Sequence, residues 1–231
     1  KYIFEELKSF LLKNKLINKD WNSLNILMQN ASTVGLLDLN ILSDKKGDDF
    51  SFFENLANKK FKFLYLLSSD NLDFKKDDEF IVYQGSHGDR GAEIADIVLP
   101  SATYTEQNGL YENLEGRVQE CKKASYPIGE SLEDWKIFNR ITKKISVKEN
   151  LVNFDQLRKE VLNIIPNFSQ INQLPVLSET QNRNVQSNFF SEDVLVRELD
   201  YYYTNSISRA SKTMSECRQI RQKIKKDGTN N

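Results

Sequence analysis

Apolar residues recur at helical spacing over the first part of the chain. From Ile3 to Leu12 they stand three or four positions apart, and the same spacing returns between Trp21 and Val34. The pattern therefore predicts two amphipathic helices near the start of the chain.

Short uninterrupted apolar runs follow, and each is closed by residues that end strands. The three runs are Phe63 to Leu67, Phe80 to Tyr83 and Asp96 to Leu99. Runs of this length predict strands, and the first two are predicted to be buried. The stretch between the first two, residues 68–79, has about the minimum length for a crossover between parallel neighbours. With a helical turn predicted at Ala92 to Ala95, the order of elements indicates an α/β core.

A hairpin and several helices are predicted after this core. The turn dipeptides Asn108-Gly109 and Glu115-Gly116 flank residues 110–113, and residues 117–121 alternate in polarity, which predicts a small hairpin. Ser131 is predicted to cap a helix that runs to about Ile145. Asn153 is predicted to cap a further helix that stops before Pro166.

The last part of the chain has weaker periodicity. Residues 167–193 are rich in Asn, Gln and Ser, which predicts a connector that follows the surface. A helical face returns from Ile207 to Cys217, and residues 223–231 are expected to be disordered.

Composition and charge narrow the function classes. With 39% hydrophobic and 28% charged residues, the chain has an ordinary globular composition. Its net charge of −1 offers no positive field for a phosphate backbone, so nucleic acid is not an expected partner. No run approaches the roughly 20 apolar residues of a membrane-spanning helix. Because the chain starts at Lys1 without a signal or transit pattern, we expect a processed chain or a fragment.

Metal ligands are scarce in this sequence. The chain has two cysteines, Cys121 and Cys217, and one histidine, His87. An iron–sulfur cluster or a structural zinc site needs about four such ligands, so no metal site is predicted. The two distant cysteines form no disulfide framework and suit free thiols in a reducing compartment. A Ser-His-Asp triad would need His87 as its base, because His87 is the one histidine of the chain, and it would have to be built on a glycine-rich loop.

That loop is the first candidate site. Glycines recur at every third residue from Gly85 to Gly91, between a predicted strand and a predicted helical turn. Backbone amides in this context can cradle a phosphate, although the spacing matches neither a dinucleotide fingerprint nor a P-loop. The interpretation we favour is a tight turn whose glycines take the left-handed conformation, in which Asp89 and Arg90 form a local ion pair and His87 hydrogen-bonds loop backbone.

Two further groups of residues are candidate sites. Glu106, Glu112 and Glu115 could supply an acid–base pair, but their spacing fixes no separation, and we favour a solvated or salt-bridged surface. The run Tyr201 to Tyr203 could stack nucleic-acid bases, yet no basic cluster interleaves with it, and we expect burial against another surface.

Four blocks of sequence, spread over nearly the whole chain, carry a family resemblance. They are WNSLNILMQNAS from Trp21, FLYLLSSD from Phe63, YQGSHGDRGAEIADIVLPSATYTEQNGLYENLEGRVQ from Tyr83 and DYYYTNSISRASKTMSEC from Asp200. The third block alone is similar to molybdopterin oxidoreductases in general. In this order, the four together resemble the C-terminal part of the largest peripheral-arm iron–sulfur subunit of respiratory complex I, NADH:ubiquinone oxidoreductase.

The resemblance implies a fold and an absence of ligands. The expected fold is α/β: a partial molybdopterin-oxidoreductase-like domain over residues 1–165, with short parallel strands and flanking helices, then an irregular extension with a helix over residues 166–231. In that family the clusters are held by cysteines of the N-terminal half, and the molybdopterin-like half has lost its cofactor. We therefore predict no catalytic, cofactor-binding or metal-binding residue here. Ser68 stands where the family commonly has glycine, which argues further against a bound pterin.

The leading hypothesis is a structural, non-catalytic part of complex I that supports electron transfer from NADH to ubiquinone. It would lie on the matrix side of the mitochondrial inner membrane, or on the cytoplasmic side in a bacterium, without a direct membrane span. Its partners would be other peripheral-arm subunits, especially the half that bears the clusters, and alone it should be poorly stable. The sequence leaves open whether the chain is a separately encoded half of a split subunit.

Two alternatives remain from the residues and the resemblance. One is a fragment of an active molybdopterin oxidoreductase, similar to formate dehydrogenase, in which the loop from Gly85 to Gly91 still contacts the pterin. The other is a free nucleotide-binding α/β module that uses the same loop.

Overall fold

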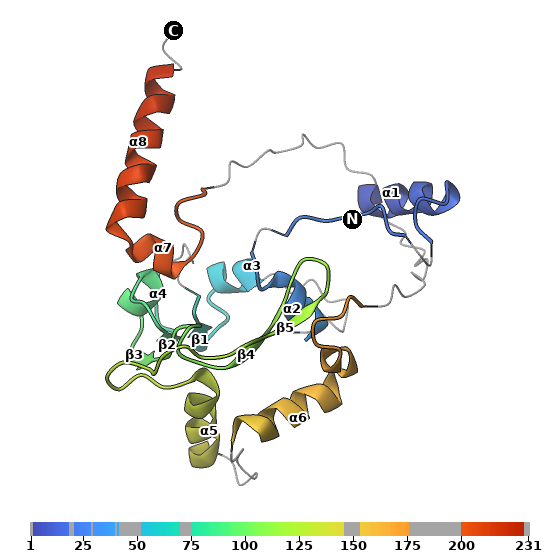
Figure 1. The fold of residues 1–231 in the computed structure, drawn as a ribbon. Helices are drawn as coiled ribbons and strands as arrows, with labels where there is room; N and C mark the ends of the chain where they lie inside the picture. Colours follow the sequence, from blue (N-terminus) through green and yellow to red (C-terminus); the bar gives the residue numbers. More distant parts are fainter. Residues whose placement is uncertain are drawn as a thin grey trace. The chain divides into compact units, whose positions relative to one another are not determined.

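The computed structural model describes residues 2–18, 21–28, 30–39, 41, 52–69, 75–145, 153–175 and 200–228 (Figure 1). The helices are α1 (Tyr2–Lys13), α2 (Thr33–Asp38), α3 (Phe52–Ala57), α4 (Arg90–Glu93), α5 (Asp134–Ile145), α6 (Phe154–Ile164), the 3-10 helix η1 (Pro166–Ser169), α7 (Ser206–Ala210) and α8 (Lys212–Gly228). The strands are β1 (Phe63–Leu67), β2 (Phe80–Gly85), β3 (Ile97–Pro100), β4 (Gly109–Glu112) and β5 (Val118–Cys121).

The chain forms two compact units, each assembled from separate segments. Unit 1 comprises Lys1–Ile41, Tyr111–Gln119 and Ile165–Glu198. Unit 2 comprises Leu42–Leu110, Glu120–Ile164 and Leu199–Asn231. The predicted division of the chain between residues 165 and 166 stays a prediction.

A three-stranded parallel sheet forms the centre of unit 2, in the order β1-β2-β3. Phe63 pairs with Phe80 at the start of β1 and β2, and Val82 pairs with Ile97 where β3 joins. The three apolar runs of the sequence are therefore strands, and the predicted parallel pair and α/β class are confirmed.

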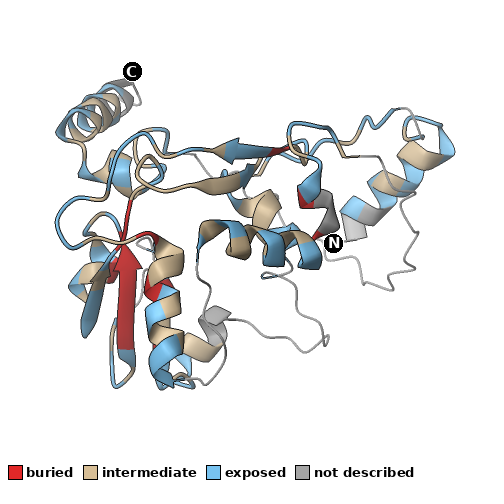
Figure 2. Ribbon diagram, turned by 60° about the horizontal axis from the view of Figure 1, so that its bottom comes forward, coloured by how far each residue is buried: buried red, intermediate tan, exposed pale blue. Residues whose placement is uncertain are grey.

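One face of this sheet carries the main apolar core of unit 2. Four strand residues are buried there: Leu64, Leu66, Ile81 and Tyr83. Partly buried apolar residues from α3, α4 and their flanking loops pack against them: Leu56, Phe61, Ala92, Ile94 and Ala95. Because side chains alternate along a strand, the central strand β2 can bury residues on both faces, and Figure 2 shows it as the most buried element of the sheet.

A polar network lies on the opposite face, where α5 begins. The Tyr65 hydroxyl donates to Oε1 of Gln84, which is fully buried. The Gln84 amide donates in turn to Asp134 Oδ1 at 2.6 Å, and Gln107 Nε2 donates to Asp134 Oδ2 at 3.0 Å. The Tyr65 ring also contacts the Phe138 ring, with centroids 5.4 Å apart. The network thereby fixes the first turn of α5 to the sheet.

The cap of α5 differs from the prediction. The Ser131 hydroxyl donates to the Ile128 carbonyl at 2.7 Å instead of accepting from the first turn of the helix. The Asp134 amide donates to Gln107 Oε1 at 3.2 Å, so a side chain from a distant loop replaces the local cap. The Asn153 cap of α6 is confirmed, because Asn153 Oδ1 accepts from the Gln156 amide at 2.9 Å.

The helix predicted between Trp21 and Val34 is wrong over most of its length. Asn18 Oδ1 accepts from the Trp21 amide, and Asn22 Oδ1 accepts from the Leu24 amide, both at 2.9 Å. These side chains give the backbone an alternative to helical hydrogen bonds. Within the described residues of this stretch, the chain is non-helical until α2 begins at Thr33.

The hairpin predicted from the sequence is confirmed as strands β4 and β5. Its tip belongs to unit 1. Gly116 has φ +80° in the turn, and an added Cβ would stand 2.9 Å from Pro175 Cγ. The segment after η1 is tied to the hairpin because the Asn172 amide donates to the Val118 carbonyl at 2.8 Å.

The C-terminal helix is longer than the sequence indicated. Helix α8 continues to Gly228, so the disorder expected from residue 223 is wrong as far as residue 228. Residues 176–193 of the predicted connector and residues 229–231 lie outside the described residues. In the described part of the chain, no helix is both long enough and apolar enough to cross a membrane.

Candidate functional site

The glycine-rich loop joins β2 to the short helix α4. Asp89 caps α4 in an extended conformation, and its Oδ1 accepts from the Arg90 backbone amide at 2.8 Å. The predicted strand, turn and helical turn are therefore present, with the turn of helix two residues earlier than expected. The left-handed conformation predicted for the loop glycines is wrong, since the described glycines with positive φ are Gly116 and Gly129, outside this loop.

The ring of Tyr83 fills the space above two of the loop glycines. Tyr83 is almost fully buried, and its hydroxyl donates to the His87 carbonyl at 2.8 Å. A Cβ added at Gly85 would stand 2.2 Å from that hydroxyl oxygen, and one added at Gly91 would stand 2.8 Å from the Ser69 carbonyl and 3.0 Å from the Tyr83 ring. Because Gly85 and Gly91 have no side chain, the Tyr83 ring can occupy the space beside them, whereas the space beside Gly88 is open.

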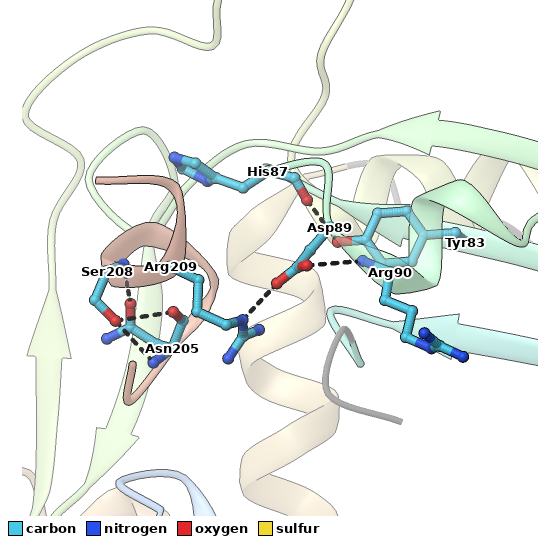
Figure 3. A network of polar contacts seen from close by, with 7 residues as sticks. All are labelled: Tyr83, His87, Asp89, Arg90, Asn205, Ser208 and Arg209. Atoms are coloured by element: carbon cyan, nitrogen blue, oxygen red, sulfur yellow. Dashed lines mark hydrogen bonds and ion pairs between the residues drawn. The ribbon is translucent and has the colours of Figure 1, made fainter. Parts of the chain in front are cut away.

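An ion pair joins the loop to the C-terminal part of the chain (Figure 3). Asp89 Oδ2 accepts from Arg209 Nε, across 120 residues of sequence. Burial alone would raise the pKa of Asp89, but hydrogen bonds from Arg209 and from the Arg90 amide outweigh it and hold the pKa below its usual value. The pair is therefore ionised at neutral pH.

A capping box holds Arg209 in place on α7. The Asn205 side chain accepts from the Ser208 amide at 2.8 Å, and the Ser208 hydroxyl accepts from the Asn205 amide at 3.1 Å. This reciprocal pair fixes the first turn of a short helix that has few turns of its own. Figure 3 shows Arg209 on the same helix, with its side chain pointing towards Asp89.

The remaining polar residues of the loop depart from the predicted pattern. Figure 3 shows the Arg90 side chain pointing away from the Asp89 carboxylate, whose contact with Arg90 is through the backbone amide. The His87 ring lies 3.0 Å from the Ser86 hydroxyl, and it is the His87 carbonyl that takes part in the loop hydrogen bonding. Sequence reasoning missed Tyr83 and Arg209. A large aromatic residue two positions before Gly85 could have indicated that the Tyr83 ring fills the space beside that glycine. No local pattern indicated that Arg209 pairs with Asp89.

The loop in this arrangement does not fit a bound phosphate. The Tyr83 ring occupies the space over Gly85 and Gly91, and the ionised carboxylate of Asp89 would repel an anion. Its partner Arg209 is already paired with that carboxylate.

Ser68 is the first residue after β1. It stands where the family resemblance led us to expect glycine. Its φ is +50°, in the left-handed region that favours glycine. The Ser68 amide donates to the Gln84 carbonyl at 2.7 Å, which continues the β1–β2 ladder by one residue. This main-chain hydrogen bond holds the start of the loop after β1 against β2.

The three glutamates considered as an acid–base group are divided between the units. Glu106 belongs to unit 2, where its Oε2 accepts from the Thr103 amide at 3.2 Å. Glu112 belongs to unit 1, and its Oε2 is buried without a hydrogen bond, which contradicts the predicted solvated or salt-bridged position. Burial and the neighbouring Asp38 carboxyl raise the pKa of Glu112 to about 7. Glu115 lies 3.8 Å from Arg117 on the surface, as predicted.

Two residues of the tyrosine run lie against arginines of α8, and the predicted burial of the run against another surface stays a prediction. The Arg218 guanidinium lies 4.5 Å from the centre of the Tyr203 ring, and Arg221 lies 5.3 Å from that of Tyr201. Tyr201 remains 65% exposed.

The thiols of Cys121 and Cys217 are free and partly buried. Among the described residues, no group of three or more His, Cys, Asp or Glu side chains could hold a metal ion.

Comparisons with known families divide the chain into two matching regions. Residues 1–144 match the family model for molybdopterin oxidoreductase. Residues 175–217 match a second model, which describes the C-terminal part of one subunit of NADH-ubiquinone oxidoreductase.

The chain is also similar to individual proteins of bacteria and mitochondria. It is 36% identical to the NADH-ubiquinone oxidoreductase 75 kDa subunit of Reclinomonas americana, covering 94% of this chain and 32% of that protein. It is 36% identical to an NADH-quinone oxidoreductase subunit of Rickettsia typhi, with 93% and 30% covered. It is 33% identical to the mitochondrial NADH dehydrogenase [ubiquinone] iron-sulfur protein 1 of Solanum tuberosum, with 96% and 29% covered. The chain thus spans about a third of the length of these relatives.

Proposed function

We propose that the chain, which belongs to the molybdopterin oxidoreductase family, is a structural part of the largest iron–sulfur subunit of complex I, because its residues 175–217 match a C-terminal part of NADH-ubiquinone oxidoreductase. In this role it supports electron transfer from NADH to ubiquinone while the redox centres lie elsewhere in the assembly. Its partners are other peripheral-arm subunits, and its place is the matrix side of the mitochondrial inner membrane or the cytoplasmic side of a bacterial one.

The observation that carries the proposal is the succession of the two family matches in one chain. The first match is shared with enzymes that use a molybdopterin cofactor, whereas the second belongs to NADH-ubiquinone oxidoreductase. The three relatives described above cover both regions, and each is named as part of an NADH dehydrogenase or oxidoreductase.

The glycine-rich loop supports a structural role over a cofactor-binding one. A phosphate-bearing cofactor such as a molybdopterin would need open backbone and a neutral or positive environment. The loop instead holds the Tyr83 ring and the Asp89 carboxylate, so it does not fit the cofactor, and we assign it no chemical step. The ion pair between Asp89 and Arg209 joins the loop at the end of β2 to α7, which supports a structural role for the loop.

The sheet of unit 2 offers apolar surface for companion segments. Ile97 and Val98 of β3 are each about half exposed, as are Phe63 and Leu67 of β1. Parallel sheets in proteins normally have both faces covered. With cysteines at two positions only, the chain also lacks the roughly four thiolates that a cluster needs, so a companion with more cysteines would bear the clusters.

The test is to isolate the native assembly that contains this chain and determine its subunits by mass spectrometry and its metals on the same sample. We expect complex I subunits, iron in molar excess over this chain and no stoichiometric molybdenum or tungsten. Stoichiometric molybdenum or tungsten without complex I subunits would overturn the proposal and favour the alternative that the first family match supports, a fragment of an active molybdopterin oxidoreductase.

A further inference from the structure

The C-terminal helix α8 carries a narrow apolar strip on a basic background. Cys217, Ile220 and Ile224 follow one another at spacings of three and four residues and so share one helix face. Ile220 is 59% exposed and Ile224 is 65% exposed. The helix has six Lys and Arg residues and two Asp and Glu residues, which gives it a net charge of +4. The second family match ends at residue 217, so most of this strip lies beyond it.

Arginines beside this strip make contacts of α8 within unit 2, and Arg221 lies three residues from Ile224 and four from Cys217. Arg218 and Arg221 lie over the rings of Tyr203 and Tyr201, and Arg218 also pairs with Asp200. These contacts attach residues 200–203 to the arginine side of α8. They leave Ile220 and Ile224 exposed on the adjacent face, where burial of each would contribute to binding.

We propose that this strip docks an acidic amphipathic helix of another complex I subunit, an inference that rests on the proposed function above. A seam with apolar residues three and four positions apart is the pattern by which two helices pack side by side. The sequence of α8 has four more cationic than anionic residues, and even with Arg218 paired to Asp200 this excess favours a partner with Asp and Glu beside its own apolar residues.

Charge and composition argue against two other occupants. A second copy of α8 would bring a net charge of +4 against an identical helix, which repels it. A membrane surface usually receives a wider apolar face with Trp, Phe or Leu, and α8 has no residue of these types.

An introduced thiol on the exposed part of the strip gives a direct measurement in the intact assembly. Two variants in the Cys217→Ser background would be compared: Ile220→Cys, because Ile220 is 59% exposed in the chain itself, and Gln222→Cys, because Gln222 is exposed on the opposite side of the same helix. Each maleimide alkylation rate would be normalised to that of the same thiol in the urea-denatured assembly. We expect alkylation at position 220 to be slower by about tenfold or more, with position 222 close to its denatured rate.

A benzophenone maleimide attached at Ile220→Cys, in the Cys217→Ser background, would identify the occupant. The expected product is a cross-link to a helix of another complex I subunit with several Asp and Glu residues. Equal normalised rates at positions 220 and 222, or cross-links to lipid or to a second copy of this chain, would overturn the docking proposal alone. Recovery of the chain without complex I subunits would overturn both this proposal and the proposed function.

Discussion

At Gly85, an added methyl group would stand 2.2 Å from the Tyr83 hydroxyl oxygen and 2.5 Å from Cζ of the same ring. Because Tyr83 is buried in the core, neither residue can move away freely. We expect Gly85→Ala to destabilise the chain by about 1–3 kcal/mol through overpacking. Pulse proteolysis of the assembly in increasing urea would report the midpoint at which this chain unfolds.

The matched control for this change is Gly88→Ala. Gly88 lies three residues away in the same loop, and nothing approaches within 4 Å of its added Cβ. Its midpoint should remain close to that of the unmodified chain. Equal effects of the two substitutions would show that Tyr83 does not occupy the space above Gly85.

The raised pKa of Glu112 should make the stability of unit 1 depend on pH. The sign of this dependence is opposite to that of a carboxylate whose pKa is lowered on folding. The pKa of Glu112 is raised to about 7 in the folded chain from an ordinary value of 4.5, so the folded state binds the extra proton. Stability should fall as pH rises from about 4.5 to 7, because the unfolded state ionises first. After allowance for solvent screening, we expect Glu112→Gln to stabilise unit 1 by on the order of 1 kcal/mol above pH 7 and to have little effect near pH 4.

Glu115→Gln is the control for Glu112→Gln, since Glu115 lies in the same hairpin but is exposed beside Arg117. Hydrogen exchange of the hairpin amides, followed between pH 5 and 8 and corrected for intrinsic rates, would measure both variants. A pH slope that Glu112→Gln leaves unchanged would contradict the assignment.

At the scale of elements, Asp134 joins the start of α5 to the sheet. Asp134→Ala would remove the acceptor of the buried Gln84 amide and of the Gln107 amide together. A buried donor left without a partner costs about 1–3 kcal/mol, and we expect a loss of stability in that range. The urea midpoint for proteolysis is again the measurement.

Asp155→Ala controls for the loss of an acidic residue in the first turn of a helix. Asp155 has the same kind of position in α6 and is exposed. Its removal should cost no more than about 0.5 kcal/mol, the contribution of a charge near a helix N-terminus. If Asp134→Ala cost no more than this control, the network would not hold α5 to the sheet.

The pair of Asp89 and Arg209 links the glycine-rich loop to α7. A double-mutant cycle with Asp89→Asn and Arg209→Gln should give a coupling energy of about 1 kcal/mol, as for partly exposed ion pairs. Because the folded pKa of Asp89 is lowered, this coupling is present above its unfolded pKa and is lost as pH falls through the folded pKa. A coupling of zero at pH 7 would mean that loop and helix are held together by other contacts.

Local patterns predicted the elements whose hydrogen bonds are local. The strands of unit 2, the hairpin, α1 and α6 follow from short apolar runs, turn dipeptides and the Asn153 cap. The helix expected from Trp21 failed because periodicity takes no account of Asn side chains that compete for the same amides. The caps and ion pairs between distant segments, such as Gln107 with Asp134 or Asp89 with Arg209, have no local sequence signal.

At the scale of the whole molecule, the glycine-rich loop shows why a motif alone did not decide the function. Glycines from 85 to 91 suit either a phosphate or a tightly packed side chain, and only the position of the Tyr83 ring distinguishes the two. The burial of Glu112 beside Asp38 likewise depends on residues more than seventy positions apart. Family resemblance carried the functional interpretation where local chemistry could not.

The most direct test of a structural role is the activity of each assembled complex when this chain is weakened. Gly85→Ala and Asp134→Ala would be introduced separately, the amount of assembled complex measured by native electrophoresis, and NADH:ubiquinone activity divided by that amount. The account predicts less assembled complex with unchanged activity per complex. A normal amount of complex with reduced activity per complex would contradict it, because the chain would then take part in electron transfer itself.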